Sequence, residues 1–155
     1  MERRTFLKSA AATGVFASLP NIINAAEPKR VFKVAIIGCG GRGWGAADNL
    51  KEAAKNLGCE IKFTAAADFF KAKADAFAQK WNVDPKFSFD GATGYKKIFE
   101  LDAANKPEVV LLTTPLNFRA VHLDAAVNAG VHVFAEKGVA VDPFTTRLFL
   151  SASKK

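Results

Sequence analysis

The sequence has few cysteines, no long apolar run and no internal repeat, and each shortage excludes a class of protein. Cys39 and Cys59 are the only two cysteines among 155 residues. Neither stands at the spacing of a metal site, so we expect free thiols, no structural disulfide and no bound metal. The apolar stretch at residues 9–19 is too short to cross a bilayer permanently. No low-complexity tract is present.

Acidic residues are outnumbered, but the excess of positive charge does not indicate a nucleic-acid-binding protein. Lysine and arginine total 22 against 15 aspartate and glutamate, a net charge of +7, of which the first 26 residues contribute +2 and the remainder +5. The basic residues are scattered and are not interleaved with aromatic ones, which is typical of a solvated surface. Half of the residues are hydrophobic, enough for one core and hence one folded domain.

The first 26 residues are predicted to be an export signal. Residues 2–8 read ERRTFLK, which resembles the twin-arginine motif S/T-R-R-x-F-L-K, with Glu2 at the usual serine or threonine position. A modestly apolar stretch follows, and Ala25 and Ala26 offer a small-residue cleavage site. We therefore expect export to the periplasm or the extracellular space, with residues 27–155 as the folded domain and no stable membrane span after cleavage. The alternative is a soluble amphipathic helix at the N-terminus.

Residues 31–45, VFKVAIIGCGGRGWG, carry the clearest signal of function. An unbroken apolar run indicates a strand buried on both faces, and glycines then follow as G-x-G-x-x-G ahead of a helix. The first glycine allows a tight turn, the second leaves room for a pyrophosphate, and the third lets helix and strand pack closely. The pattern predicts a dinucleotide-binding loop made of Gly38, Cys39, Gly40, Gly41, Arg42 and Gly43.

Strands and helices then alternate along the chain. Apolar runs predict strands at residues 31–37, 60–67, 86–89, 109–113 and 131–135, with helices at 42–57, 95–102, 117–129 and 142–153 and one more around residues 74–81. In the helix at 117–129 we expect Phe118, Val121 and Ala125 to lie in register, and at 142–153 Asp142 should cap the helix with Pro143 at its first position. The alternation predicts a Rossmann-type α/β fold: a doubly wound parallel sheet with five strands, the sixth missing at a truncated C-terminus.

Asp68 is the second informative position, because it ends the second predicted strand. A carboxylate there can accept hydrogen bonds from the adenosine ribose and would repel the extra phosphate of NADP. NAD is therefore favoured over NADP, although Lys71 lies near enough to oppose that preference. Asp68 could instead cap the second helix.

Two further segments resemble a known family. Residues 113–122 read TTPLNFRAVH and residues 129–137 read AGVHVFAEK. Together with GCGGRG at 38–43, these segments resemble the glucose–fructose oxidoreductase, inositol dehydrogenase and rhizopine-catabolism (Gfo/Idh/MocA) family from Val31 to the C-terminus. The predicted strand ends place their polar residues at one edge of the sheet, and the candidate cofactor contacts there are Thr113, Thr114, Pro115, Asn117, His122, Glu136 and Lys137.

The resemblance implies an NAD(P)-dependent enzyme acting on a sugar or cyclitol. The family's Glu-Lys-Pro motif matches Glu136 and Lys137, and the lysine would polarise or help deprotonate the reacting hydroxyl if burial lowers its pKa. Gly138 replaces the family's proline, which would loosen the placement of the lysine. The alternative for Lys137 is a surface residue, and for His122 a packing residue; His132 is expected to pack within its strand.

The family's second domain, an α+β module that supplies most substrate contacts, has no counterpart in the sequence. We therefore expect cofactor binding without turnover by this chain alone, and a homo-oligomer for a full-length protein. Two alternatives stay open: an NAD-dependent glycoside hydrolase of the same superfamily, and a non-catalytic nucleotide-binding module.

Overall fold

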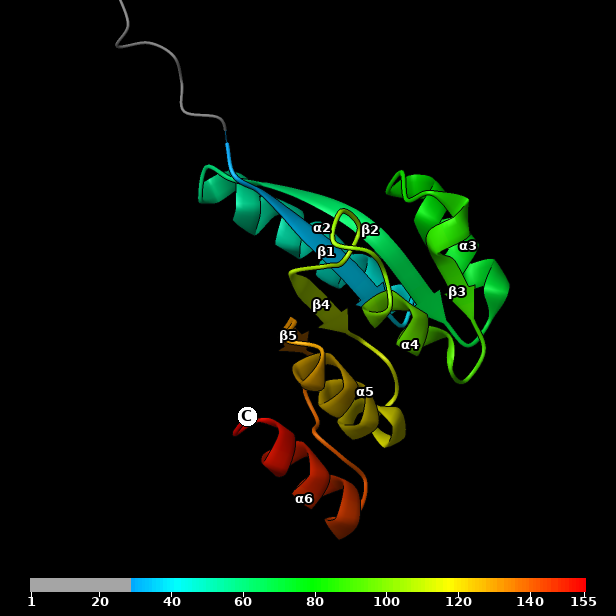
Figure 1. The fold of residues 1–155 in the computed structure, drawn as a ribbon, viewed down its shortest axis with the longest axis vertical. Coiled ribbons are helices and arrows are strands. Elements are labelled where there is room, and N and C mark those ends of the chain that lie inside the picture. Colours follow the sequence, from blue (N-terminus) through cyan, green and yellow to red (C-terminus); the bar gives the residue numbers. More distant parts are fainter. Residues whose placement is uncertain (1–28) are drawn as a thin grey trace, which may run out of the picture.

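The computed structural model describes residues 29–155, which form one parallel sheet wrapped by helices (Figure 1). The strand order is β3-β2-β1-β4-β5, and each neighbouring pair is parallel. The bounds are β1 Val31–Ile37, β2 Glu60–Asp68, β3 Ser88–Asp90, β4 Val109–Leu112 and β5 His132–Ala135. This arrangement confirms the predicted Rossmann-type fold, in which chain order reverses between β1 and β4.

Helices cover both faces of the sheet. They are α2 Gly41–Asn56, α3 Lys71–Lys80, α4 Gly94–Phe99, α5 Leu116–Asn128 and α6 Pro143–Ala152, with a short 3-10 turn at Pro85–Phe87. The helices α2 and α3 pack on one face, and α4 and α5 pack on the other. The helix α6 packs against α5, far from α2 and α3 (Figure 1).

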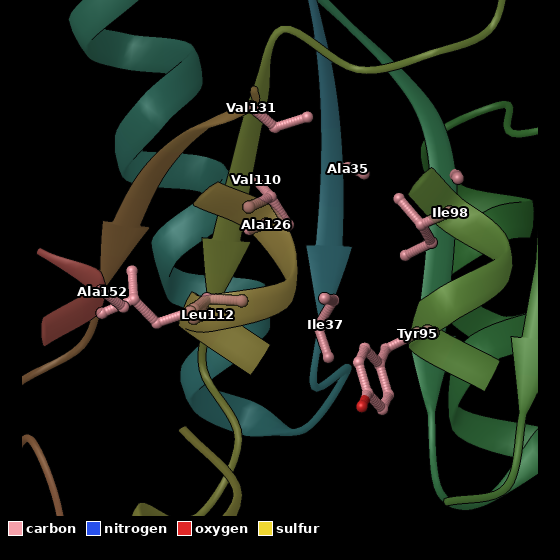
Figure 2. Packing of buried hydrophobic residues seen from close by; sticks show 12 residues of the cluster. Ala35, Ile37, Tyr95, Ile98, Val110, Leu112, Ala126, Val131 and Ala152 are labelled. Atoms are coloured by element: carbon pink, nitrogen blue, oxygen red, sulfur yellow. The ribbon is translucent and has the colours of Figure 1, made fainter. Parts of the chain in front are cut away.

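The alternation of side chains along the central strands produces two cores. Val34 and Ile36 of β1 point toward α2 and α3, where Phe77 lies with its ring 5.1 Å from that of Phe63. Ala35 and Ile37 point the other way, toward α4 and α5 (Figure 2). Because β1 is buried on both faces, its apolar run needs no polar alternation.

The buried face of α5 differs from the one predicted. Phe118 and Val121 are 48% and 44% exposed. The helix instead buries a face that contains two polar side chains; its members are Arg119, Ala120, His122, Leu123 and Ala126. Apolar spacing alone misplaced Phe118 and Val121, whereas Ala125 packs partly buried against the core. Both polar residues of the buried face have hydrogen-bond partners inside the protein and are therefore stable when buried.

Other boundaries lie within a few residues of the predictions. The third strand starts at Ser88 because a 3-10 turn occupies residues 85–87, with Asp84 accepting a hydrogen bond from the N–H of Lys86 at 3.1 Å. The predicted cap of α6 is confirmed, since Asp142 accepts from the N–H of Thr145 at 2.9 Å. Cys39 and Cys59 are both free thiols.

The predicted export signal at residues 1–26 lies outside the described residues. Within residues 29–155, no helix combines the length and the apolar character needed to span a membrane.

Candidate functional site

A cleft of about 520 Å³ opens at the C-terminal ends of β1, β2 and β4, where ligands bind in open α/β sheets. We call it the strand-end cleft. Its lining includes Gly38, Gly40, Gly41, Arg42, Asp68, Thr113, Thr114, Pro115 and His122 from among the predicted site residues. Cys39 and Gly43 are buried directly behind it, and Asn117, Glu136 and Lys137 do not line it.

The glycines of the glycine loop, residues 38–43, have two different roles. A Cβ on Gly38, whose φ is +102°, would lie 2.8 Å from the backbone nitrogen of Thr114, and one on Gly43 would lie 2.2 Å from the carbonyl oxygen of Gly38. A Cβ on Gly40 would meet no protein atom within 4 Å. The fold itself therefore requires the first and third glycines, whereas the second keeps open a space that belongs to the cleft.

The N-terminus of α2 faces this space. Its cap residue, Gly40, has no side chain, and the first turn holds no acidic residue. The first helical hydrogen bond runs from the N–H of Trp44 to the carbonyl of Gly40, at 3.1 Å. The preceding N–H groups and the positive end of the helix dipole therefore suit an anion such as a phosphate.

Asp68 links the end of β2 to the glycine loop. Its Oδ2 accepts a hydrogen bond from the N–H of Cys39 at 2.8 Å, and its Oδ1 accepts one from the N–H of Phe70 at 2.9 Å. The helix α3 begins only at Lys71, with Phe70 as its cap residue. Asp68 thus forms a loop clamp rather than the helix cap considered as an alternative, and its oxygens retain lone pairs for hydroxyl donors in the cleft.

Three cleft residues beyond Asp68 were not found from the sequence. Phe69 and Phe70 line the cleft beside Asp68, and Lys73 follows with its Nζ 4.9 Å from the centre of the Phe70 ring. Lys71, the cation considered at this end, pairs instead with Asp75 and does not line the cleft. The sequence offered only their position as a signal: they follow Asp68 by one to five residues and therefore lie near its carboxylate.

His122 lies at the floor of the strand-end cleft. It is 7% exposed, and its Nδ1 shares a 3.1 Å hydrogen bond with Oγ1 of Thr114. Its ring lies 4.4 Å from that of Tyr95 and stacks on Phe118 at 6.2 Å. Figure 2 shows Tyr95 beside Ile37, at the end of β1. Burial lowers the pKa of His122 from 6.5 to about 4, so the imidazole is neutral at neutral pH.

Arg119 is the residue that sequence reasoning missed most completely. Although 5% exposed, its guanidinium donates hydrogen bonds to four backbone carbonyls. Nη1 donates to Glu136, at 2.8 Å, and to the two residues that follow it, and Nη2 donates to Thr114. The segment 136–138 is thereby fixed against the loop after β4. The available signal was an arginine on a helix face that is otherwise apolar apart from His122.

Glu136 bridges to the glycine loop through an ion pair with Arg42. The hydrogen bond from Arg42, with a smaller contribution from the charge of Arg119, holds the pKa of the Glu136 carboxyl below its usual value. The same pair raises the pKa of Arg42. Both groups are therefore charged at neutral pH.

Comparison with known proteins identifies the family. A profile described as an oxidoreductase family with an NAD-binding Rossmann fold, Gfo/Idh/MocA, matches residues 32–151. The chain belongs to this family. No match was found among curated protein sequences.

Solved structures agree with this assignment. An oxidoreductase from Thermotoga maritima is 27% identical over 81% of this chain and 36% of its own, with a TM-score of 0.58. A 3-ketoreductase from Actinomadura kijaniata, in complex with TDP-benzene and NADP, is 26% identical over 81% and 36%, with a TM-score of 0.60. The myo-inositol 2-dehydrogenase from Lactobacillus plantarum shares the fold at 22% identity over 81% and 33%, with a TM-score of 0.64. The chain thus spans about a third of these relatives' length.

The structure explains how this member of the Gfo/Idh/MocA family accommodates glycine in place of the motif proline. Gly138 has φ +81°, and a Cβ there would lie 2.3 Å from Cδ2 of Leu116. Proline, fixed near φ −65°, does not fit this backbone. Arg119 supplies the restraint instead, by holding the carbonyls of residues 136–138. Lys137 itself is exposed, as is Asn117.

His122 generates a prediction about stability and pH. Its pKa is about 4 in the folded protein against 6.5 ordinarily, so between these values the unfolded chain binds more protons. The contribution of the neutral buried ring is complete above pH 6.5 and is lost as the pH falls toward 4. The difference corresponds to roughly 3 kcal/mol of the free energy of unfolding.

Urea unfolding measured across this pH range tests the effect. His122→Gln should flatten the fall in stability between pH 6.5 and 4. The control is His132→Gln, which should leave the slope unchanged, because His132 is exposed and not packed within its strand as predicted. Parallel slopes for all three proteins would show that the buried imidazole is not the source.

Proposed function

We propose that this chain is the cofactor-binding domain of an NAD-dependent oxidoreductase that acts on a CH–OH group of a sugar or cyclitol. The observation that carries the proposal is the open position at Gly40 beside the uncapped start of α2, at the wall of the strand-end cleft. The cleft volume, about 520 Å³, is within the usual range of small-molecule sites. A dinucleotide would place its pyrophosphate at Gly40 and Gly41.

The residues beyond β2 favour NAD over NADP. Asp68 lies where the adenosine ribose would bind, and its carboxylate would repel a 2′-phosphate at that position. Lys73 also lines the cleft, and its positive charge would favour the 2′-phosphate. The ketoreductase relative contains NADP, so family membership alone does not decide between the two. The direct clamp between Asp68 and the loop supports the carboxylate as the dominant group.

Titration of the chain with each reduced cofactor tests this preference. We expect the dissociation constant of NADPH to exceed that of NADH by at least about tenfold, or about 1.4 kcal/mol, measured by nicotinamide fluorescence. Lys73→Ala should widen the gap by weakening NADPH binding alone. Equal or tighter binding of NADPH would contradict the role given to Asp68.

Substitution at Gly40 tests where the pyrophosphate lies. Gly40→Val should fold normally, because its φ of −79° suits any residue and no protein atom lies near the new Cβ. It should weaken NADH binding by on the order of a hundredfold, since the branched side chain fills the space that the pyrophosphate needs. The smaller Gly40→Ala should have an intermediate effect.

Thermal unfolding of both Gly40 variants serves as the control for folding. A stable Gly40→Val protein that binds NADH as the wild type does would place the dinucleotide elsewhere.

The chemical step is assigned to Lys137, which matches the lysine of the family's Glu-Lys-Pro motif. Its ammonium group would polarise the reacting hydroxyl. Lys137 is exposed, so residues 29–155 do not provide the burial on which a role as base depends. Arg119 fixes the backbone on either side of it. The remaining substrate contacts would come from outside residues 29–155.

The test uses a protein in which this domain is joined to a substrate domain of the family. Such a protein should reduce NAD when given a sugar or cyclitol such as glucose or myo-inositol, detected by nicotinamide absorbance. Lys137→Ala should lower kcat by on the order of a hundredfold with little change in NADH affinity, whereas Lys154→Ala, at an exposed position of the C-terminus, should not. Full activity of Lys137→Ala would show that Lys137 has no catalytic role.

A further inference from the structure

The ion pair between Arg42 and Glu136 connects two separate strand ends. Arg42 lies in the first turn of α2, directly after β1, and Glu136 follows β5. In the sheet, β4 lies between β1 and β5. The two side chains therefore span the width of β4 at the edge of the strand-end cleft, between the glycine loop and the segment that carries Lys137.

The two partners differ in how firmly they are held. The side chain of Glu136 is 11% exposed, and its Oε2 accepts a hydrogen bond from the N–H of Lys137 at 3.3 Å. Arg119 donates to the Glu136 carbonyl and adds positive charge nearby. The side chain of Arg42 is 53% exposed and lines the cleft. Glu136 is thus anchored independently of the pair, while Arg42 is free to turn toward another anion.

A second anion is expected at the same place. The pyrophosphate of a dinucleotide carries two negative charges and would lie at Gly40 and Gly41, next to Arg42 in sequence and in the cleft wall. A guanidinium binds phosphate oxygens in the same bidentate manner as a carboxylate. The pair with Glu136 uses Nη2 of Arg42. Either bidentate arrangement of a guanidinium on a phosphate also includes Nη2, so the phosphate and Glu136 compete for that nitrogen.

We propose that Glu136 is the resident anion of Arg42 in the free domain and that a phosphate of the dinucleotide displaces it on binding. The inference rests on the proposed cofactor site. Glu136 then sets the cofactor affinity without touching the cofactor: its carboxylate lowers the affinity, because each binding event must break the ion pair. Displacement also releases a carboxylate beside Lys137.

A double-mutant cycle on NADH binding measures this competition. Glu136→Gln should lower the dissociation constant of NADH by about three- to tenfold, because the competing charge is gone. Arg42→Met should raise it by about tenfold or more, because the phosphate loses its partner. In the Arg42→Met background, Glu136→Gln should change the constant by less than about twofold, since no pair remains to be broken.

Glu60→Gln is the matched control. It removes the same charge from an exposed ion pair with Lys29, whose Nζ lies 3.9 Å from the Glu60 carboxylate. Glu60 begins β2, so this pair lies at the opposite end of the strands from the cleft. Its dissociation constant for NADH should equal that of the wild type, which separates the local pair from the general change in net charge.

A measurement on the wild-type protein tests the displacement without relying on any variant to fold. The side-chain NMR signal of the Arg42 guanidinium should shift on addition of NADH, and inorganic pyrophosphate should shift it in the same direction. An unmoved signal in NADH-saturated protein would overturn the exchange.

The outcomes distinguish the two proposals. A wild-type protein that binds NADH, with Glu136→Gln neutral or weaker, would overturn the displacement while leaving the cofactor site intact. A wild-type protein that binds neither NADH nor NADPH would overturn the cofactor site and the displacement together.

Discussion

The buried guanidinium of Arg119 is the interaction on which the geometry of the site depends. An arginine removed from water is costly unless carbonyl oxygens replace its hydration. Four carbonyls accept from the two Nη groups of Arg119, while its Nε has no partner among the described residues. Those carbonyls belong to two loops that are distant in sequence, one after β4 and one after β5. The hydrogen bonds that stabilise the buried Nη groups therefore also align the two loops.

Two further hydrogen bonds join the loops after β1 and β2 to the two loops that Arg119 holds. Thr113 donates its hydroxyl to the carbonyl of Gly38, which connects the loop after β4 to the loop after β1. Asp68 connects the loop after β1 to the end of β2. The cleft walls are thus fixed by the protein's own hydrogen bonds before any ligand arrives. A site organised in advance spends little binding free energy on ordering itself.

The fold could be predicted from the sequence because local signals agree with the global pattern. Apolar runs at β1 and β4, glycines at 38–43 and Asp142 ahead of Pro143 each dictate one element by short-range physics, and the order of elements then restricts the sheet. What could not be predicted depends on partners far away in sequence. The buried face of α5 holds Arg119 and His122 because carbonyls of residues 136–138 and the hydroxyl of Thr114 form hydrogen bonds with them. The spacing of apolar residues in the helix gives no information about such partners. Likewise, Lys73 and not Lys71 lines the cleft, because Lys71 pairs with Asp75, one helical turn further along α3.

Cys39 gives the loop an internal chemical reporter. Its side chain is 1% exposed beneath the glycine loop, its Sγ lies 3.6 Å from the carbonyl of Ala67, and burial raises the pKa of the thiol. A thiol in that state does not react with alkylating reagents, because the reactive species is an exposed thiolate. Labelling of Cys39 must therefore wait for the loop to lift away from Asp68, so its rate would record how often the loop opens. Cys59, which is partly exposed, would provide the reference reaction within the same molecule.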